Sequence, residues 1–183
     1  MSLRNFDDDQ LLQLLQTDEA KAIEIIFKTY HSTLCISAYR LLKSKDASKD
    51  VVQEVFMRFW KKRETIRINT SLKAYLRRAV VNTALNHLQK KRRYPTDDLD
   101  KLPEMSSNKN SAQDNLQAAQ LKSDIQDAIA TLPKKCRLVF TLSRYEQMTY
   151  KEIAESLQIS VNTVENHISK ALKIMKGELK GYL

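Results

Sequence analysis

One stretch combines basic residues with asparagines at steps of four residues, which aligns them on one side of a helix: Arg78, Asn82, Asn86 and Lys90. Arginine and lysine bind phosphates, and asparagine can hydrogen bond to base edges. The surrounding segment 61–93 holds eleven lysines and arginines and a single acid. A basic run is usually only a solvated surface, but this mixture at helical spacing favours a nucleic-acid contact.

A second stretch has the signals of two short helices joined by a tight turn. Thr149 and Glu152 form a capping-box pattern, and Ser160 is a good N-cap for the second helix. Ala154 and Val164 lie ten residues apart, which suits the close crossing of a helix-turn-helix. The polar side chains that would face outward are Asn162, Glu165, Asn166 and Ser169, together with Val161. The alternative is an ordinary helical hairpin whose polar face is solvated.

The composition indicates an all-α protein with a polyanionic partner. The chain has 183 residues, of which only two are glycine and three proline, and 42% are hydrophobic. Its net charge is +9, which favours a nucleic acid without proving one. Cys35 and Cys136 have no paired spacing, so we expect two free buried thiols and a reducing, cytoplasmic location. No signal peptide or long apolar run is recognisable.

Charge divides the chain into two basic lobes and an acidic spacer. Residues 1–93 carry a net charge of +9, residues 94–117 a net −3, and residues 118–183 a net +3. The middle segment contains two prolines and several serines and asparagines. We therefore expect two small helical bundles joined by a flexible linker.

Apolar periodicity predicts helices at Ala20–Lys43, Asp50–Lys62 and Leu72 to about Lys91, with a polar break at Ser44–Ser48. The expected buried residues of the first are Ile23, Ile26, Phe27, Tyr30, Leu34, Ile36, Ala38, Leu41 and Leu42. Those of the second are Val51, Val52, Val55, Phe56, Phe59 and Trp60. Those of the third are Leu72, Leu76, Ala79, Val80, Thr83 and Leu88. Asp50, Gln53, Glu54 and Met57 share another flank, which is either solvated or a protein-docking surface.

Together the two lobes resemble the extracytoplasmic-function (ECF) sigma factors of bacterial RNA polymerase, in the family's order and over nearly the whole chain. The first lobe matches the region-two pattern at Asp50, Gln53, Glu54, Phe56, Trp60, Tyr75, Leu76 and Asn82. The second matches the region-four pattern, including Leu132-Pro133, Arg137, Tyr150-x-Glu152-Ile153-Ala154, Thr163-Val164, His167-Ile168 and Lys170-Ala171-Leu172. The chain departs from the family at Lys49, Tyr75, Asn86 and Gln158, the last at a turn position often held by glycine.

The resemblance implies roles for three sets of residues. The set that would bind and help to open the −10 promoter element is Lys61, Lys62, Arg63, Arg67, Asn69, Lys73, Arg77, Arg78, Asn82, Asn86 and Lys90. The set that would bind the −35 element is Ser160, Val161, Asn162, Thr163, Glu165, Asn166, His167, Ser169, Lys170 and Lys173. The set that would dock on the clamp of the polymerase core is Asp50, Gln53, Glu54 and Met57. An anti-sigma protein is a further expected partner.

Two other classes of function remain open to the sequence. The last 45 or so residues also resemble the helix-turn-helix of response regulators, but such a protein needs an α/β receiver, and residues 1–93 show no alternating strands. Catalysis is not expected, because the sequence has no glycine-rich phosphate loop, no nucleophile and base arrangement, and no metal-spaced cluster. We expect no cofactor, no metal and no small-molecule substrate.

Overall fold

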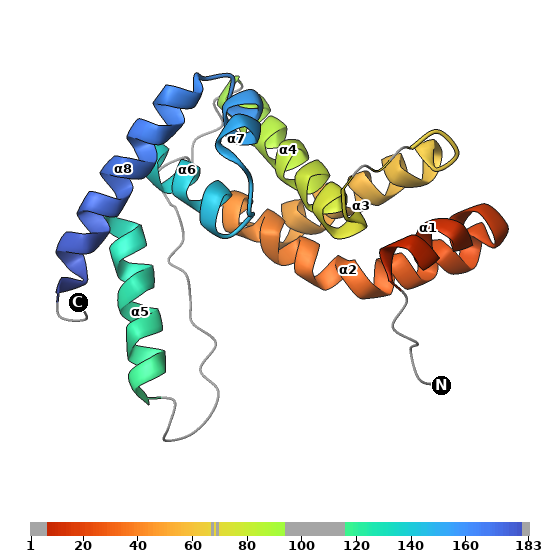
Figure 1. Ribbon diagram of the computed structural model, residues 1–183, viewed down its shortest axis with the longest axis horizontal. Helices are drawn as coiled ribbons and strands as arrows, with labels where there is room; N and C mark the ends of the chain where they lie inside the picture. Colours follow the sequence, from red (N-terminus) through yellow and green to blue (C-terminus); the bar gives the residue numbers. More distant parts are fainter. Residues whose placement is uncertain (1–6, 67, 69, 94–115, 181–183) are drawn as a thin grey trace. The chain divides into compact units, whose positions relative to one another are not determined.

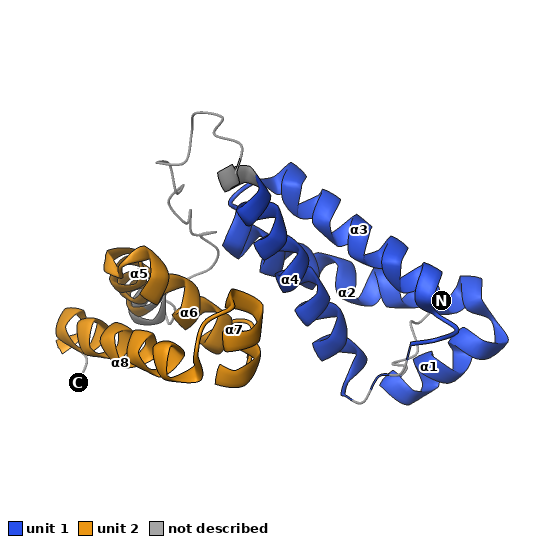
Figure 2. Cartoon of the chain, turned by 90° about the horizontal axis from the view of Figure 1, so that it is seen from above, with its two compact units in different colours: residues 1–97 blue, residues 98–183 orange. Residues whose placement is uncertain are grey.

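The chain folds into helices that divide between two compact units, residues 1–97 and 98–183 (Figure 2). The computed structural model describes residues 7–66, 68, 70–93 and 116–180. Every regular element within these ranges is a helix, which confirms the all-α prediction. The expected linker, 94–117, lies outside the described residues except for its last two positions, which begin a helix. Among the described helices, none is both long and apolar enough to cross a bilayer.

Unit 1 contains four helices, of which the second is the central one. They are α1 (Asp8–Thr17), α2 (Glu19–Leu42), α3 (Lys45–Lys62) and α4 (Leu72–Arg93). Helix α2 packs against α1, α3 and α4, and α3 also packs against α4 (Figure 1). The core includes Leu11, Ile26, Leu34, Val52, Phe59, Leu72, Leu76 and Val80. Three amphipathic helices thus bury their apolar sides around α2.

Helix α3 begins earlier than its apolar pattern indicates, so the prediction of a polar break over Ser44–Ser48 is wrong. Ser44 is the N-cap, and its hydroxyl oxygen accepts a hydrogen bond from the Ala47 N–H at 3.3 Å. The Ser48 side chain is buried, and its hydroxyl donates to the Ser44 carbonyl at 2.5 Å. The first turn of α3 is polar in sequence but helical because the cap satisfies its backbone.

The predicted cores were too broad on α2 and α3 and too narrow on α4. Phe27 is 40% exposed, Ile36 51% and Trp60 37%, although all three were expected inside. On α4, by contrast, Val81, Ala84 and Leu85 are buried although the predicted core did not include them. Helix α4 packs against two neighbours, α2 and α3, so its buried arc is wider than the single stripe that periodicity indicates.

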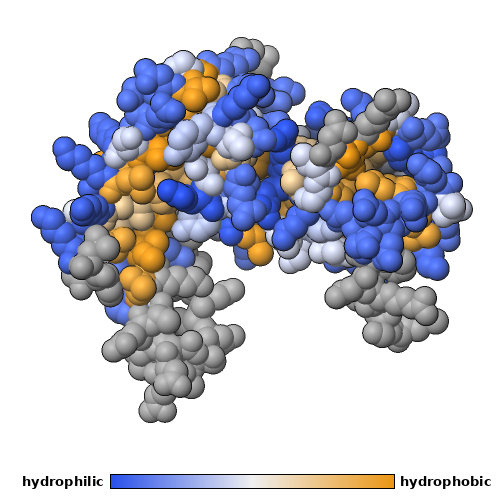
Figure 3. Space-filling view, viewed as in Figure 1, coloured by the Kyte–Doolittle hydropathy of each residue, from blue (hydrophilic) through white to orange (hydrophobic). Residues whose placement is uncertain are grey.

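Unit 2 contains α5 (Leu116–Thr131), α6 (Lys134–Arg144), α7 (Tyr150–Leu157) and α8 (Val161–Glu178). Helix α8 packs against the other three. Buried side chains of α5, α6 and α8, together with Leu132 between α5 and α6, form one core cluster with the members Ile129, Leu132, Cys136, Phe140 and Ala171. Figure 3 shows apolar surface gathering over unit 2 where α5 and α8 meet, while hydrophilic residues cover the outer sides of these helices. Leu172 of α8 is 43% exposed.

A carboxylate joins three helices of unit 1. Asp8, half-buried in the first turn of α1, accepts a hydrogen bond from the Tyr30 hydroxyl of α2 at 2.8 Å. Its other oxygen accepts from the Leu72 N–H, the first of α4, at 2.7 Å. Burial, followed by this hydrogen bond to Asp8, raises the pKa of Tyr30 to about 12. Asp8 therefore fixes where the basic helix α4 starts relative to α1 and α2.

Asp8→Ala is expected to destabilise unit 1 by about 2 kcal/mol, because it leaves a half-buried phenol and a helix N–H without their charged acceptor. Urea unfolding followed by fluorescence measures this effect in unit 1 alone, since Trp60 is the only tryptophan of the chain.

Asp9→Ala is the matched control, because Asp9 is an exposed carboxylate in the same helical turn. Its loss should cost about 0.5 kcal/mol or less. Equal losses in the two variants would mean that only the α1 helix dipole is involved. The Asp8 variant should also lower the pKa of Tyr30, which ultraviolet titration detects.

Candidate DNA and protein interfaces

The predicted basic stripe of α4 lies mainly on the outside of unit 1. Arg78, Asn86 and Lys90 are exposed and Asn82 is half-buried, while the apolar side chains of α4 face the core. Lys73 is exposed and Arg77 half-buried beside the stripe. The helix start is held by Ser71, whose hydroxyl oxygen accepts from the Ala74 N–H at 3.1 Å, and by Asp8. A rigid helix therefore presents amides and positive charges at regular spacing.

The segment between α3 and α4 contains one arginine held by several contacts. The Arg63 Nε lies 2.7 Å from a Glu19 carboxylate oxygen and its Nη2 lies 3.3 Å from Glu64. Its guanidinium carbon lies 4.5 Å from the centre of the Trp60 ring, and its side chain is only 22% exposed. These contacts tie the end of α3 to the start of α2. Lys61 and Lys62 are exposed, whereas Arg67 and Asn69 lie outside the described residues.

The helix-turn-helix is built by the caps that its sequence predicts. The Thr149 hydroxyl oxygen accepts from the Glu152 N–H at 3.3 Å, and the Glu152 carboxylate accepts from the Thr149 N–H at 2.9 Å. Ser160 caps α8, its hydroxyl oxygen accepting from the Thr163 N–H at 3.1 Å. Ala154 and Val164 are both buried, as expected for residues at a close helix crossing.

Gln158 occupies the turn in the left-handed conformation, with φ 55° and ψ 45°. The next N–H, from Ile159, donates to the Ala154 carbonyl at 3.0 Å, which closes the Schellman-type end of α7. The turn therefore keeps its hydrogen bonds without a glycine, and the glutamine adopts the strained backbone instead of shifting the turn.

Most predicted −35 residues lie on the exposed side of α8. The exposed ones are Ser160, Val161, Asn162, Glu165, Asn166, Ser169, Lys170 and Lys173. Thr163 is half-buried, and its hydroxyl lies 2.8 Å from that of Ser160. His167 is also half-buried, and its Nδ1 lies 3.5 Å from the Cys136 sulfur. His167 thus links α8 to α6, whereas Thr163 contacts the N-cap of its own helix.

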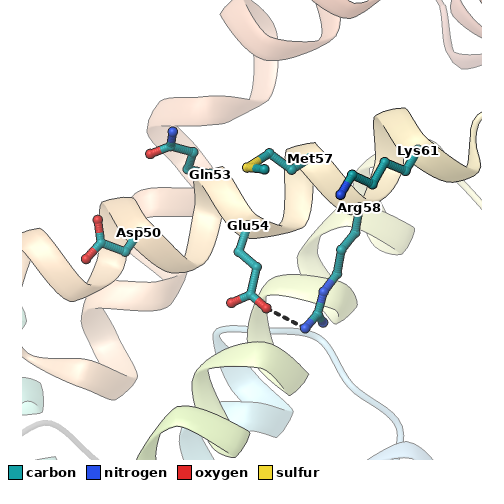
Figure 4. A pocket seen from close by; sticks show the side chains of 6 residues that line it. All are labelled: Asp50, Gln53, Glu54, Met57, Arg58 and Lys61. Carbon is teal, nitrogen blue, oxygen red and sulfur yellow. Dashed lines mark hydrogen bonds and ion pairs between the residues drawn. The ribbon is translucent and has the colours of Figure 1, made fainter.

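The polar flank of α3 surrounds an exposed apolar side chain. A shallow hollow of about 310 Å³ is lined by Asp50, Gln53, Glu54, Met57, Arg58 and Lys61, all from α3. Figure 4 shows these six side chains along the helix. Met57 is 53% exposed. Glu54 forms an ion pair with Arg58, one helical turn later. An exposed methionine within a polar rim has the composition of a protein-docking surface.

Sequence reasoning missed Phe27 as part of the surface of unit 1. Its ring lies 4.9 Å from that of Phe56 and 4.5 Å from that of His31, measured between centroids. His31 and Cys35 follow Phe27 at steps of four residues, and this polar continuation could have marked the edge of the buried stripe. The Cys35 sulfur lies 3.6 Å from His31 Nε2. Burial raises the pKa of the Cys35 thiol, although Cys35 is half-buried and only Cys136 is fully buried.

Two family models match the chain in order. The model of sigma-70 region 2 matches residues 26–94, and that of sigma-70 region 4 matches residues 122–175. The first match covers most of the helices of unit 1, including α3 and α4. The second covers the helix-turn-helix and the helices before it.

Curated relatives are similar over nearly their whole length. The ECF RNA polymerase sigma-E factor of Haemophilus influenzae is 26% identical, with 94% of this chain and 95% of the relative covered. The RNA polymerase sigma-H factor of Pseudomonas aeruginosa is also 26% identical, with 96% and 95% covered.

Two solved structures share the fold. CnrH in complex with the cytosolic domain of CnrY gives a TM-score of 0.55 at 19% identity, covering 95% of this chain and 97% of the other. The sigma factor RpoE of Bartonella quintana, in complex with the anti-sigma factor NepR, gives 0.56 at 23% identity, covering 87% and 98%.

Gln158→Gly is expected to stabilise unit 2 by about 1 kcal/mol. The left-handed conformation costs an L residue roughly 1–2 kcal/mol, and the greater freedom of glycine in the unfolded chain offsets part of the gain. Circular dichroism at increasing temperature measures the change, and Trp60 fluorescence separates it from the unfolding of unit 1.

Gln158→Ala is the control for this variant, because alanine keeps the Cβ that makes the left-handed backbone costly. It should not raise the unfolding temperature of unit 2. A gain of equal size with alanine would show that the glutamine side chain, not the backbone, is responsible.

Proposed function

The chain belongs to the ECF group of the sigma-70 family and directs core RNA polymerase to promoters, and we propose that its two units divide promoter recognition between the −10 and −35 elements. The observation that supports this division is one helix in each unit with exposed polar and basic side chains, α4 in the first and α8 in the second. The response-regulator alternative is not favoured, because region 2 of sigma-70 matches the part where a receiver would stand.

Helix α4 is proposed to bind the −10 element. Arg78 and Lys90 are placed to contact phosphates, and Asn86, on the same exposed stripe, is placed to meet a base edge. Asn69 and Arg67 stay predictions for the preceding loop. The contacts of Arg63 with Glu19 and Trp60 favour a role in shaping the start of that loop.

Helix α8 is proposed to enter the major groove of the −35 element. Its N-terminal turns carry short exposed side chains, which can approach base edges closely. Lys170 and Lys173, exposed in later turns, are placed to bind the flanking phosphates. The hydroxyl cap at Ser160 leaves the positive end of the α8 dipole without a neighbouring carboxylate in the first turn.

The exposed flank of α3 is proposed to dock on the polymerase core. Met57 supplies apolar area, and Asp50, Gln53 and Glu54 supply its polar rim. The RpoE structure contains an anti-sigma factor, and we propose that a protein of that kind is a partner here too.

Run-off transcription with purified core polymerase and a promoter library tests the function and the docking surface together. The wild type should give promoter-specific transcripts, and their complete absence would contradict the function. Gln53→Ala combined with Glu54→Ala should weaken core binding by roughly tenfold. Unit 1 stability should change little, because an exposed ion pair at this spacing contributes about 0.5 kcal/mol or less.

Glu24→Ala is the matched control for the docking variant. Glu24 forms the same type of exposed ion pair, with Lys28, on α2. The control should bind core polymerase like the wild type. If it loses as much affinity, the effect reflects surface charge in general and not the α3 flank.

Lys170→Ala should weaken binding to −35 DNA without changing the preferred sequence. Removing one phosphate contact should reduce the slope of log affinity against log salt by roughly one unit. Fluorescence anisotropy over a range of salt concentrations measures this slope. Lys21→Ala, which removes an exposed lysine from unit 1, should leave it unchanged, and a changed base preference in the Lys170 variant would contradict the phosphate assignment.

A further inference from the structure

Two parallel rows of exposed side chains run along the front of α8. At steps of four residues, one row consists of Val161, Glu165 and Ser169, and the other of Asn162, Asn166 and Lys170. The buried side chains of the helix, Val164, Ile168 and Ala171, lie on the side that packs against the unit. The helix therefore presents five exposed side chains before its first lysine, four of them in the first two turns.

These side chains are not the ones that read guanine most often. Bidentate pairing of arginine or lysine with guanine O6 and N7 is the commonest specific contact in the major groove. Helix α8 contains no arginine, and its first two turns contain no lysine. Asparagine instead pairs with adenine N6 and N7, glutamate accepts from cytosine N4, and an apolar side chain packs on the thymine methyl group. We propose that α8 reads adenines through Asn162 and Asn166, a cytosine through Glu165 and a thymine through Val161, without a bidentate contact to guanine.

Glu165 is the most informative residue of this set, because a carboxylate on a DNA-facing surface is repelled by phosphates. Ionised, it has only hydrogen-bond acceptors. Guanine and thymine offer it acceptors at O6, N7 and O4, whereas cytosine offers the N4 amino group. The base opposite Glu165 is therefore cytosine, with adenine second through its N6 amino group, and the same carboxylate rejects guanine and thymine.

The positions of the lysines agree with this assignment. Lys170 lies one turn beyond Asn166 in the same row, and Lys173 lies further on. The N-terminal residues of a recognition helix contact base edges, and its later turns leave the groove towards the backbone. The lysines thus contribute affinity that does not depend on the base sequence, and the short side chains distinguish between bases. The inference rests on the proposed role of α8 as the −35 reader.

The test uses the holoenzyme, formed from the full chain and core polymerase, on a library with a fixed −10 element and a randomised −35 element. Sequencing of the transcripts gives the base preference at each position. The wild type should select adenines, a cytosine and a thymine. In Glu165→Gln, one position should change from cytosine towards adenine by roughly tenfold, because glutamine offers one donor and one acceptor.

Glu178→Gln is the matched control, because it removes the same charge from an exposed site at the far end of α8 and should leave every preference unchanged. If Glu165→Gln instead increases transcription from all −35 sequences equally, Glu165 only repels the DNA phosphates and the inference is overturned. Asn162→Ala and Asn166→Ala should each relax the base preference at one position. If the wild type requires guanine at such a position, the inference is also overturned. Absence of any −35 preference in the wild type would overturn the proposed function, and this inference with it.

Discussion

The first N–H groups of a helix need acceptors and favour negative charge, and a basic helix meets this need with difficulty. Helix α4 has no acid in its first turn, where Lys73 stands. The structure supplies the charge from another helix: Asp8 of α1 accepts from the Leu72 N–H while it also holds Tyr30. The position of the proposed −10 reader thus depends on one shared carboxylate.

The caps of the helices differ in charge. Helices α1 and α2 are capped by Asp7 and Asp18. Helix α8 is capped by a serine hydroxyl and, like α4, has no acid in its first turn. A carboxylate cap stabilises a helix but cancels its positive end, whereas a hydroxyl cap satisfies the N–H groups and leaves that end available. Hydroxyl caps are not confined to α8, however, because Ser44 caps α3 and Thr149 caps α7. The serine cap therefore leaves the positive end of α8 available without by itself marking a helix that approaches DNA.

Features encoded over a few neighbouring residues were predictable from the sequence. The capping box at Thr149 and the serine cap at Ser160 are set by residues three apart, and the structure has both. The bond between Asp8 and Leu72 joins residues 64 apart, so no local pattern indicates it. The exposure of Phe27 and the burial of Leu85 depend on how many helices pack around each one. The contacts of Arg63 depend on Glu19, which only the folded unit brings near.

The two helices proposed to face DNA distribute charge differently, and on this assignment they contribute differently to DNA binding. On α4, Asn82 and Asn86 lie between Arg78 and Lys90 on one stripe. Phosphate contacts by the basic residues and base contacts by the asparagines therefore alternate along the same helix. On α8, the front turns carry Glu165 and no cation, and the lysines follow behind. Most of the affinity that depends on counterion release therefore belongs to α4, and discrimination by hydrogen bonds belongs to α8. Helix turns that attract phosphates only weakly discriminate well between base sequences, because incorrect sequences then gain little affinity from non-specific charge.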